Sequence, residues 1–322
     1  MRSALTDHSS TPGPAPGPAL RVTTPRKMLR LAAVALSCCA AGLAAAADSA
    51  ANPAVALRAH YEVLHQRPGS NPFQRPLYLE STETADGVAG SIHALVDHPF
   101  ASAASELNGP TRWCEILLLH LNIKYCRAAT DGSGSTLRVY IGKKHEQPLD
   151  DAYPVDFAWR VAAASPDYLK VMLRADEGPL STRDYRITLE AVPLDGSRTV
   201  LHLAYSYGYG FAGKVAMQAY LATIASDKLG FTVAGKQSDG RPIYIGGMRG
   251  LVERNTMRYY LAIESYLGAL STPPQARLEK SLHDWFAAIE RYPRQLHELE
   301  QGEYLAMKRK EYLRARTAVR AP

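Results

Sequence analysis

The stretch from residue 155 to residue 207 constrains the fold most, because apolar and polar side chains alternate along it. Four segments show this alternation: 155–161, 169–174, 185–190 and 201–207. Turn residues such as Asp195-Gly196 separate them. Side chains of a strand alternate between the two faces of a sheet, so the pattern predicts an antiparallel four-strand meander with one apolar and one wet face. The apolar face must be covered by another element.

The positive charge of the chain is concentrated near its start. The formal net charge is +6, but residues 1–46 hold five of the 37 basic residues and one of the 31 acidic ones. The rest of the chain is therefore about +2. This balance does not support binding to nucleic acid, and we predict no nucleic-acid partner.

The same segment has the layout of an export signal. A basic stretch at 26–30 precedes an apolar stretch at 31–43, and Ala44 to Ala46 offers a small-residue cleavage site. We predict cleavage near Ala46 and a periplasmic or secreted mature protein. Cys38 and Cys39 lie within the apolar stretch in a context that fits a lipoprotein site badly.

Two cysteines, Cys114 and Cys126, are present after the predicted cleavage site. In an oxidising compartment an even number of cysteines favours a disulfide, which would tie a helix to the next strand. The alternative is a pair of separate buried thiols.

Flanking segments add helices and hairpins around the meander. The first helix is expected at 52–67, with Val55, Ala59, Val63 and Leu64 on its apolar side. Strands are expected at 77–79, 88–96, 122–128, 136–141, 231–233 and 243–245, and further helices at 100–107, 111–119, 214–225, 249–270, 275–289 and 293–315. We divide the chain into a signal peptide and disordered leader (1–46), an N-terminal helix and linker (47–76), a sheet-and-helix domain (77–270) and a C-terminal helical extension (271–322).

This order of elements resembles the START-like (SRPBCC) helix-grip superfamily over residues 77–270. Local stretches also resemble a family of exported proteobacterial proteins, a likeness that implies no activity. They are His98-Pro99-Phe100, Trp113-Cys114-Glu115-Ile116-Leu117, Asn122-Ile123-Lys124-Tyr125-Cys126 and Glu253-Arg254-Asn255-Thr256-Met257-Arg258-Tyr259-Tyr260. The resemblance implies an α+β fold in which an antiparallel sheet curls around the long helix 249–270 and encloses an apolar cavity.

Such a cavity would be lined by apolar and aromatic side chains with a few polar groups. The predicted ligand-binding residues are Phe157, Trp159, Tyr185, Tyr205 and Tyr207 on the sheet, and Arg254, Tyr259, Ile263 and Tyr266 on the helix. The alternative is a solid core made of the same residues. Arg254 and Arg258 are expected at the rim or in solvent, and the alternative is contact with an acidic headgroup inside the cavity.

Catalytic chemistry has little support in the sequence. Asp156, Glu190, His202 and His93 are expected on the wet face. His120 is the one candidate catalytic residue, and the alternative is a hydrogen-bonded core histidine. Metalloprotease, nucleophile-elbow and paired-cysteine motifs do not occur in the sequence, so we predict neither metal nor cofactor.

The C-terminal segment is basic and amphipathic. Lys308, Arg309, Lys310 and Arg314 would contact an anionic membrane surface. The alternative is a solvated helix that is packed through its apolar residues: Leu299, Tyr304, Met307, Tyr312 and Leu313.

Together these features predict an exported protein that binds, and carries, an apolar small molecule or lipid without catalysing a reaction. One alternative is a cyclase-type enzyme on the same fold. Another is an envelope interaction protein with a solid core that acts through its basic tail.

Overall fold

The computed structural model describes residues 52–67, 71–223 and 228–320. The predicted signal peptide, its cleavage site near Ala46 and the leader lie outside the described residues. Residues from 52 onward group into one compact unit.

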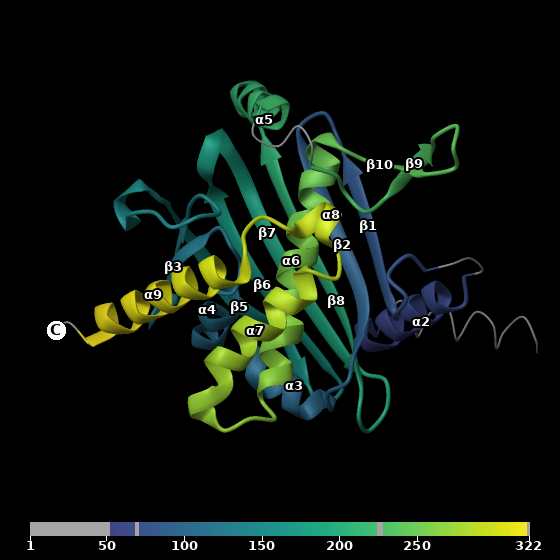
Figure 1. Ribbon diagram of the computed structural model, residues 1–322. Coiled ribbons are helices and arrows are strands. Elements are labelled where there is room, and N and C mark those ends of the chain that lie inside the picture. Colours follow the sequence, from purple (N-terminus) through teal and green to yellow (C-terminus); the bar gives the residue numbers. More distant parts are fainter. Residues whose placement is uncertain (1–51, 68–70, 224–227, 321–322) are drawn as a thin grey trace, which may run out of the picture. The chain divides into compact units, whose positions relative to one another are not determined.

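An eight-stranded antiparallel sheet is the centre of this unit (Figure 1). Its strands, in spatial order, are β1 (Leu77–Glu83), β2 (Gly87–Val96), β8 (Thr199–Tyr209), β7 (Thr182–Pro193), β6 (Tyr168–Glu177), β5 (Tyr153–Ser165), β4 (Gly134–Ile141) and β3 (Ile123–Asp131). The predicted meander is confirmed as β5 to β8. The hairpin β1–β2 extends it beside β8, and the hairpin β3–β4 extends it beside β5.

The register separates the two faces row by row. In one row Ile92, Leu203, Leu189 and Val171 are direct cross-strand neighbours, and all four are buried. The next row holds His93, His202, Glu190 and Lys170. Because a shift of one residue exchanges the faces, this register puts the apolar row on the inner face and the polar row on the outer face.

The long helix α6 (Gly247–Ala269) lies against β1, β2 and β8. Its bounds differ by two residues or fewer from the predicted 249–270. In Figure 1 it runs in front of the sheet, with α7 (Arg277–Ile289) beside it. The fold is therefore α+β with the predicted helix-grip arrangement.

The environment of α6 corrects one expectation. Arg254 and Arg258 are each 1% exposed, rather than solvated or at the rim. α7 and α8 (Pro293–Leu296) cover the side of α6 away from the sheet. The guanidinium groups are accommodated there because they donate hydrogen bonds to backbone carbonyls, Arg254 to Leu229 at 3.2 Å and Arg258 to Leu296 at 3.2 Å.

The first helix, α2 (Pro53–His65), covers part of the outer face of the sheet. It buries Leu57 and Tyr61, among other residues, in a cluster with Val192 and Val200 of the sheet. The predicted apolar side of the helix was right for Leu64, which is buried, and wrong for Ala59 and Val63, which are exposed, Val63 to 58%. Tyr61 points toward the sheet, and the spacing of apolar residues along the helix does not predict this.

The position of α2 also corrects the expectation for His93. This residue is on the outer face, as predicted, but it is 6% exposed instead of solvated. Its ring contacts that of His60 on α2, at 4.5 Å, and stacks on that of His202 on β8, at 4.1 Å. The outer face is thus wet over only part of its area.

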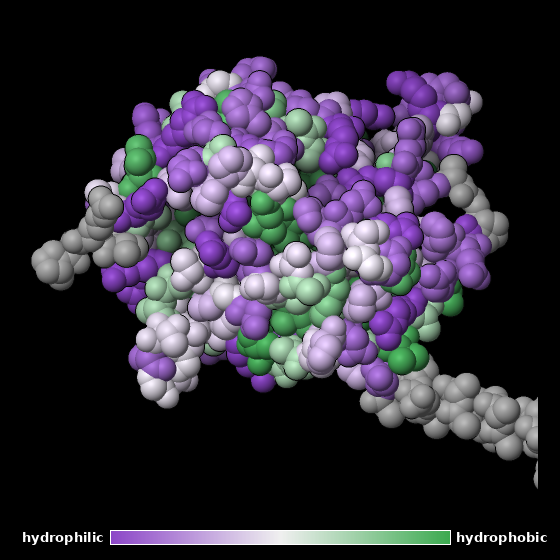
Figure 2. Space-filling model, turned by 90° about the horizontal axis from the view of Figure 1, so that it is seen from below, coloured by the Kyte–Doolittle hydropathy of each residue, from purple (hydrophilic) through white to green (hydrophobic). Residues whose placement is uncertain are grey.

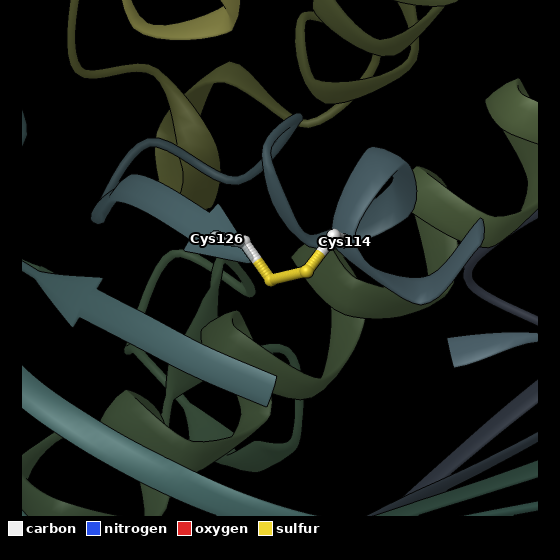
Figure 3. The surroundings of a disulfide bond; sticks show 2 residues. All are labelled: Cys114 and Cys126. Carbon is white, nitrogen blue, oxygen red and sulfur yellow. A yellow bond between two sulfur atoms is a disulfide. The ribbon is translucent and has the colours of Figure 1, made fainter. Parts of the chain in front are cut away.

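Two short helices connect β2 to β3 at the far edge of the sheet, α3 (Phe100–Leu107) and α4 (Pro110–Leu117). The predicted disulfide is confirmed: Cys114 on α4 is bonded to Cys126 on β3, with the two Cα atoms 5.2 Å apart (Figure 3). The bond fixes the second short helix to the edge strand.

The C-terminal extension packs onto the rest of the unit. The predicted helix 293–315 is two helices, α8 and α9 (Gln301–Arg320), because His297 has an extended backbone and ends the first. α7 lies on α6, and α9 lies on β3. None of the described helices is long and apolar enough to cross a membrane.

The predicted membrane contact requires Lys308 on α9 to lie on the surface, but this residue is buried. It is 2% exposed, and its Nζ donates to the carbonyls of His120 and Ile123 and to Glu311. Its burial follows from the packing of α9 on β3, which turns this side chain toward backbone acceptors.

The other predicted membrane-contacting cations are more accessible. Arg309 and Lys310 are exposed and form ion pairs with Glu279 and Glu146. Arg314 lines a surface hollow of about 470 Å³ together with Arg127 and other residues.

The remaining elements are α5 (Phe211–Thr223) and a small hairpin of β9 (Val233–Lys236) and β10 (Pro242–Tyr244). On the face shown in Figure 2, hydrophobic residues appear as separate patches among hydrophilic ones.

Candidate ligand-binding cavity

A cavity of about 740 Å³ lies between the inner face of the sheet and α6. Its lining comprises His120, Asn122, Ile141, Gly142, Lys143, Lys144, His145, Asp151, Tyr153, Pro179, Leu180, Thr182, Tyr185, Tyr205, Tyr207, Met217, Leu251, Asn255, Tyr259, Glu298 and Leu299. The lining runs from buried residues to exposed ones such as Tyr153 and Leu180, so the cavity reaches the surface. Its size is that of a site for a small molecule.

Tyrosines form one continuous wall of the cavity. Tyr185 on β7 stacks on Tyr207 of β8 at 5.3 Å, Tyr207 contacts Tyr205 at 5.7 Å, and Tyr205 contacts Tyr259 of α6 at 5.3 Å. Burial raises the pKa of Tyr185 to about 12 and raises the pKa of the other three phenols as well. All four hydroxyls are therefore protonated at neutral pH and can donate hydrogen bonds.

The position of Tyr185 depends on a glycine. A Cβ atom on Gly178 would lie 2.3 Å from the Tyr185 ring, closer than any real contact, so the ring can occupy this place only beside glycine. The chain between them takes left-handed backbone angles at Leu180, Ser181 and Asp184 (φ 57°, 57° and 53°). Such angles in non-glycine residues are strained and are enriched at functional sites. Here they occur at the mouth of the cavity.

His120 lines the cavity at the end of this wall. Its ring stacks on Tyr259 at 4.6 Å, and its Nδ1 accepts a hydrogen bond from the Asn122 backbone N–H at 3.1 Å. Burial, reinforced by nearby cationic side chains, holds the pKa of His120 well below its usual value. The ring is therefore neutral, and because Nδ1 is an acceptor, the proton is on Nε2.

Charged groups gather beside His120. The Glu298 carboxylate accepts hydrogen bonds from Lys144 at 2.5 Å and from Arg258 at 2.8 Å. Burial lowers the pKa of Lys144 to about 8 despite this partner. The pKa of Glu298 is lowered; burial alone would raise it, but the neighbouring cations outweigh that effect. This end of the cavity is polar, whereas the tyrosine wall is largely apolar.

Four of the nine predicted ligand-binding residues line the cavity: Tyr185, Tyr205, Tyr207 and Tyr259. The other five do not. Phe157, Trp159 and Ile263 are packed in the core, and the Tyr266 hydroxyl donates to Glu106 at 2.8 Å. Arg254 faces the backbone of Leu229 instead. The cavity occupies only one end of the space between sheet and helix, and the core fills the rest.

The lining residues contributed by loops were not predicted from the sequence. Asn122, Lys144 and Glu298 are examples, and they come from three separate segments. Periodicity gives no signal for residues outside regular elements. The Leu-His-Leu context of His120 was the one available hint of a buried polar group near the site.

The described residues contain no group of side chains that could hold a metal ion, that is, no group of three or more histidines, cysteines, aspartates or glutamates. Of the outer-face histidines, His93 and His202 stack face to face at 4.1 Å, and the His60 ring is tilted by 50° against that of His93.

Comparisons with known proteins give low similarity. No family model matches the chain, and no curated protein matches it. Among solved structures, a norcoclaurine synthase mutant from Thalictrum flavum, in complex with a transition-state analogue, is 15% identical with a TM-score of 0.32, over 45% of this chain and 93% of that one. The Zhui aromatase/cyclase from Streptomyces sp. R1128 is 12% identical with a TM-score of 0.32, and the match covers 46% of this chain and 86% of that one.

A conserved protein from Geobacillus kaustophilus is 17% identical with a TM-score of 0.28, over 44% of this chain and 85% of that one. At such TM-scores these likenesses add nothing to the strand order and helix placement, on which the helix-grip assignment rests. The resemblance to exported proteobacterial proteins stays a prediction.

Proposed function

We propose that this protein is an exported binding protein for an apolar small molecule or lipid, held in the cavity between the sheet and α6. The cavity of about 740 Å³ with its tyrosine wall is the observation that carries the proposal. A mostly apolar lining with a few polar groups is the usual composition of a small-molecule site. The solid core assumed for an interaction protein does not agree with this cavity.

Export is supported by the Cys114–Cys126 disulfide, because such bonds persist mainly in oxidising compartments. It is also supported by the signal-like sequence that ends near Ala46. Contact with an anionic membrane through Arg309, Lys310 and Arg314 would bring the protein close to a lipid ligand.

A cyclase-type enzyme is the second candidate, since His120 lies in the cavity as that hypothesis requires. The arrangement favours binding over base catalysis. A general base needs a free lone pair and a pKa near the working pH. In His120 the lone pair on Nδ1 is engaged by Asn122, and the pKa is far below neutral.

The experiment is native mass spectrometry of the mature protein purified from the periplasm, before and after organic extraction. We expect a stoichiometric adduct that extraction removes. Leu251→Trp on α6 and Met217→Trp on α5 should each fill the cavity and abolish the adduct. Leu313→Trp, at a position that is 64% exposed on α9, is the matched control and should retain it.

An apo mass that persists after incubation with a lipid extract would contradict the proposal. Retention of the adduct by both cavity-filling variants, with wild-type thermal stability, would place the ligand outside the cavity.

A further inference from the structure

Two buried polar atoms of the cavity lining have no hydrogen-bond partner among the described residues: His120 Nε2 and the Tyr207 hydroxyl. The side chains are 2% and 4% exposed. A buried donor without an acceptor costs free energy, and native proteins rarely leave one unsatisfied. A cavity that is lined by two such groups is one in which a ligand supplies the missing acceptor.

The chemistry of that acceptor follows from His120. The Asn122 N–H occupies Nδ1, so Nε2 carries the hydrogen and acts as a donor. The donor is uncharged. The lining holds two lysines: Lys143 is exposed to solvent, and Lys144, whose charge acts on His120, already donates to Glu298 at 2.5 Å. A neutral donor beside a satisfied ion pair suits an uncharged oxygen better than an anion, which would lose its hydration without gaining a free counter-charge.

The shape of the ligand follows from the rings. From His120 an unbroken run of ring contacts passes through Tyr259 and Tyr205 to Tyr207, with centroid distances of 4.6, 5.3 and 5.7 Å. Such a surface offers stacking and edge contacts to a flat molecule.

We propose that the cavity takes a flat aromatic or polycyclic ligand bearing an uncharged, carbonyl-type oxygen, and that this oxygen accepts a hydrogen bond from His120 Nε2–H. The inference rests on the proposed function and specifies its ligand. His120 is then a recognition residue that selects an oxygen-bearing ligand over a pure hydrocarbon.

The test compares two probes of matched shape, 2-acetylnaphthalene and 2-ethylnaphthalene, by titration of tyrosine fluorescence or by calorimetry. The wild type should bind the ketone about tenfold more tightly, which is the effect of one hydrogen bond to a buried donor. His120→Phe keeps the ring on Tyr259 but removes the donor, so it should bind the two probes equally. Tyr207→Phe removes the other unpartnered hydroxyl and should keep the tenfold preference.

A second readout protects the test if His120→Phe does not fold. In ¹⁵N-histidine-labelled wild-type protein, the His120 Nε2–H resonance should shift with the ketone and stay in place with the hydrocarbon. Equal binding of both probes by the wild type would overturn the oxygen assignment and leave the proposed function intact. A preference that is lost in Tyr207→Phe and kept in His120→Phe would overturn the role of His120. Failure of both probes to bind would instead count against the cavity as a binding site, and with it the proposed function.

Discussion

His120 and His93 are both buried, and in both burial lowers the pKa, yet they lie on opposite faces of the sheet in very different company. On the outer face, His93 is enclosed by protein: the His202 ring stacks on it, and the His60 ring of α2 contacts it at a tilt. On the inner face, His120 is fixed on one side by Asn122 and Tyr259 and borders the cavity. Burial is therefore common to the two histidines, and what distinguishes His120 is that it borders a cavity.

His93 belongs to a structural network on the outer face, because its ring stacks on that of His202. His202 Nδ1 hydrogen-bonds the Glu190 carboxylate at 3.0 Å, and the same carboxylate accepts hydrogen bonds from Lys170 at 3.2 Å and from Tyr168. His202 and Tyr168 help to hold the pKa of Glu190 at about 2. This network joins neighbouring strands under the N-terminal helix, which is a role in stability.

The largest expected effect is loss of stability in mild acid, to which both histidines contribute. Burial, with two neighbouring histidines, lowers the pKa of His93 to about 3 from 6.5, and the pKa of His120 is also lowered. Below pH 6.5 the two histidines become protonated in the unfolded chain but stay neutral in the folded protein. The free energy of unfolding therefore decreases as the pH is lowered. For His93 we expect a loss of about 2 kcal/mol between pH 7 and pH 5, and the contribution of His120 has the same sign.

Urea unfolding at pH 7 and pH 5 measures this loss in the wild type, His93→Phe, His120→Phe and the double variant. The window stays above the range in which Glu190 titrates. His98, whose pKa is also lowered, contributes with the same sign, so the differences between variants decide the matter. If the double variant loses as much unfolding free energy between pH 7 and pH 5 as the wild type does, the two histidines do not cause the loss.

The next effect concerns the cover of the outer face by α2. Leu57→Ala on α2 removes a side chain that is 8% exposed and should cost about 3 kcal/mol of unfolding free energy. Val63→Ala on the same helix, at a position that is 58% exposed, should cost less than about 0.5 kcal/mol. Thermal unfolding measures both. Equal costs would mean that α2 does not pack on the outer face through Leu57.

Ligand binding should give a smaller effect, an increase in the free energy of unfolding that depends on His120 and not on His93. At ten times its Kd, the naphthyl ketone should stabilise the wild type by about 1.4 kcal/mol. His93→Phe should gain the same increment, because the outer face does not contact the cavity, whereas His120→Phe should gain less at the same concentration. Denaturant unfolding with and without the probe gives these values. A reduced increment in His93→Phe would show that the two faces are coupled.

The smallest effect on stability is expected outside both faces, on α9. Lys310→Ala removes an exposed ion pair with Glu146 and should change the unfolding free energy by less than about 1 kcal/mol. It should weaken co-sedimentation with anionic phosphatidylglycerol vesicles by a few fold if the tail meets a membrane. Lys280→Ala, which removes the Lys280–Asp284 pair on α7, is the matched control. Equal vesicle binding by the two variants and the wild type would contradict the membrane contact.

The sequence by itself determined most of the regular elements and the apolar face of the sheet. The alternation at 155–207 predicted the meander, the spacing within α6 predicted the long helix, and the isolated pair Cys114 and Cys126 predicted the disulfide. These properties are local, or depend on a single pair, so a one-dimensional pattern contains them.

Only the tertiary structure decided what covers each face. The contact of His120 with Tyr259 joins residues far apart in the chain, and so does the burial of Lys308 against the loop that contains His120. Periodicity shows that a face is apolar but not which element lies over it, nor whether packing fills the space between them. The outer-face position of α2, the burial of Arg254 and the cavity beside the tyrosine wall therefore depended on the assembled fold, because each is set by the distance between segments that the sequence leaves unspecified.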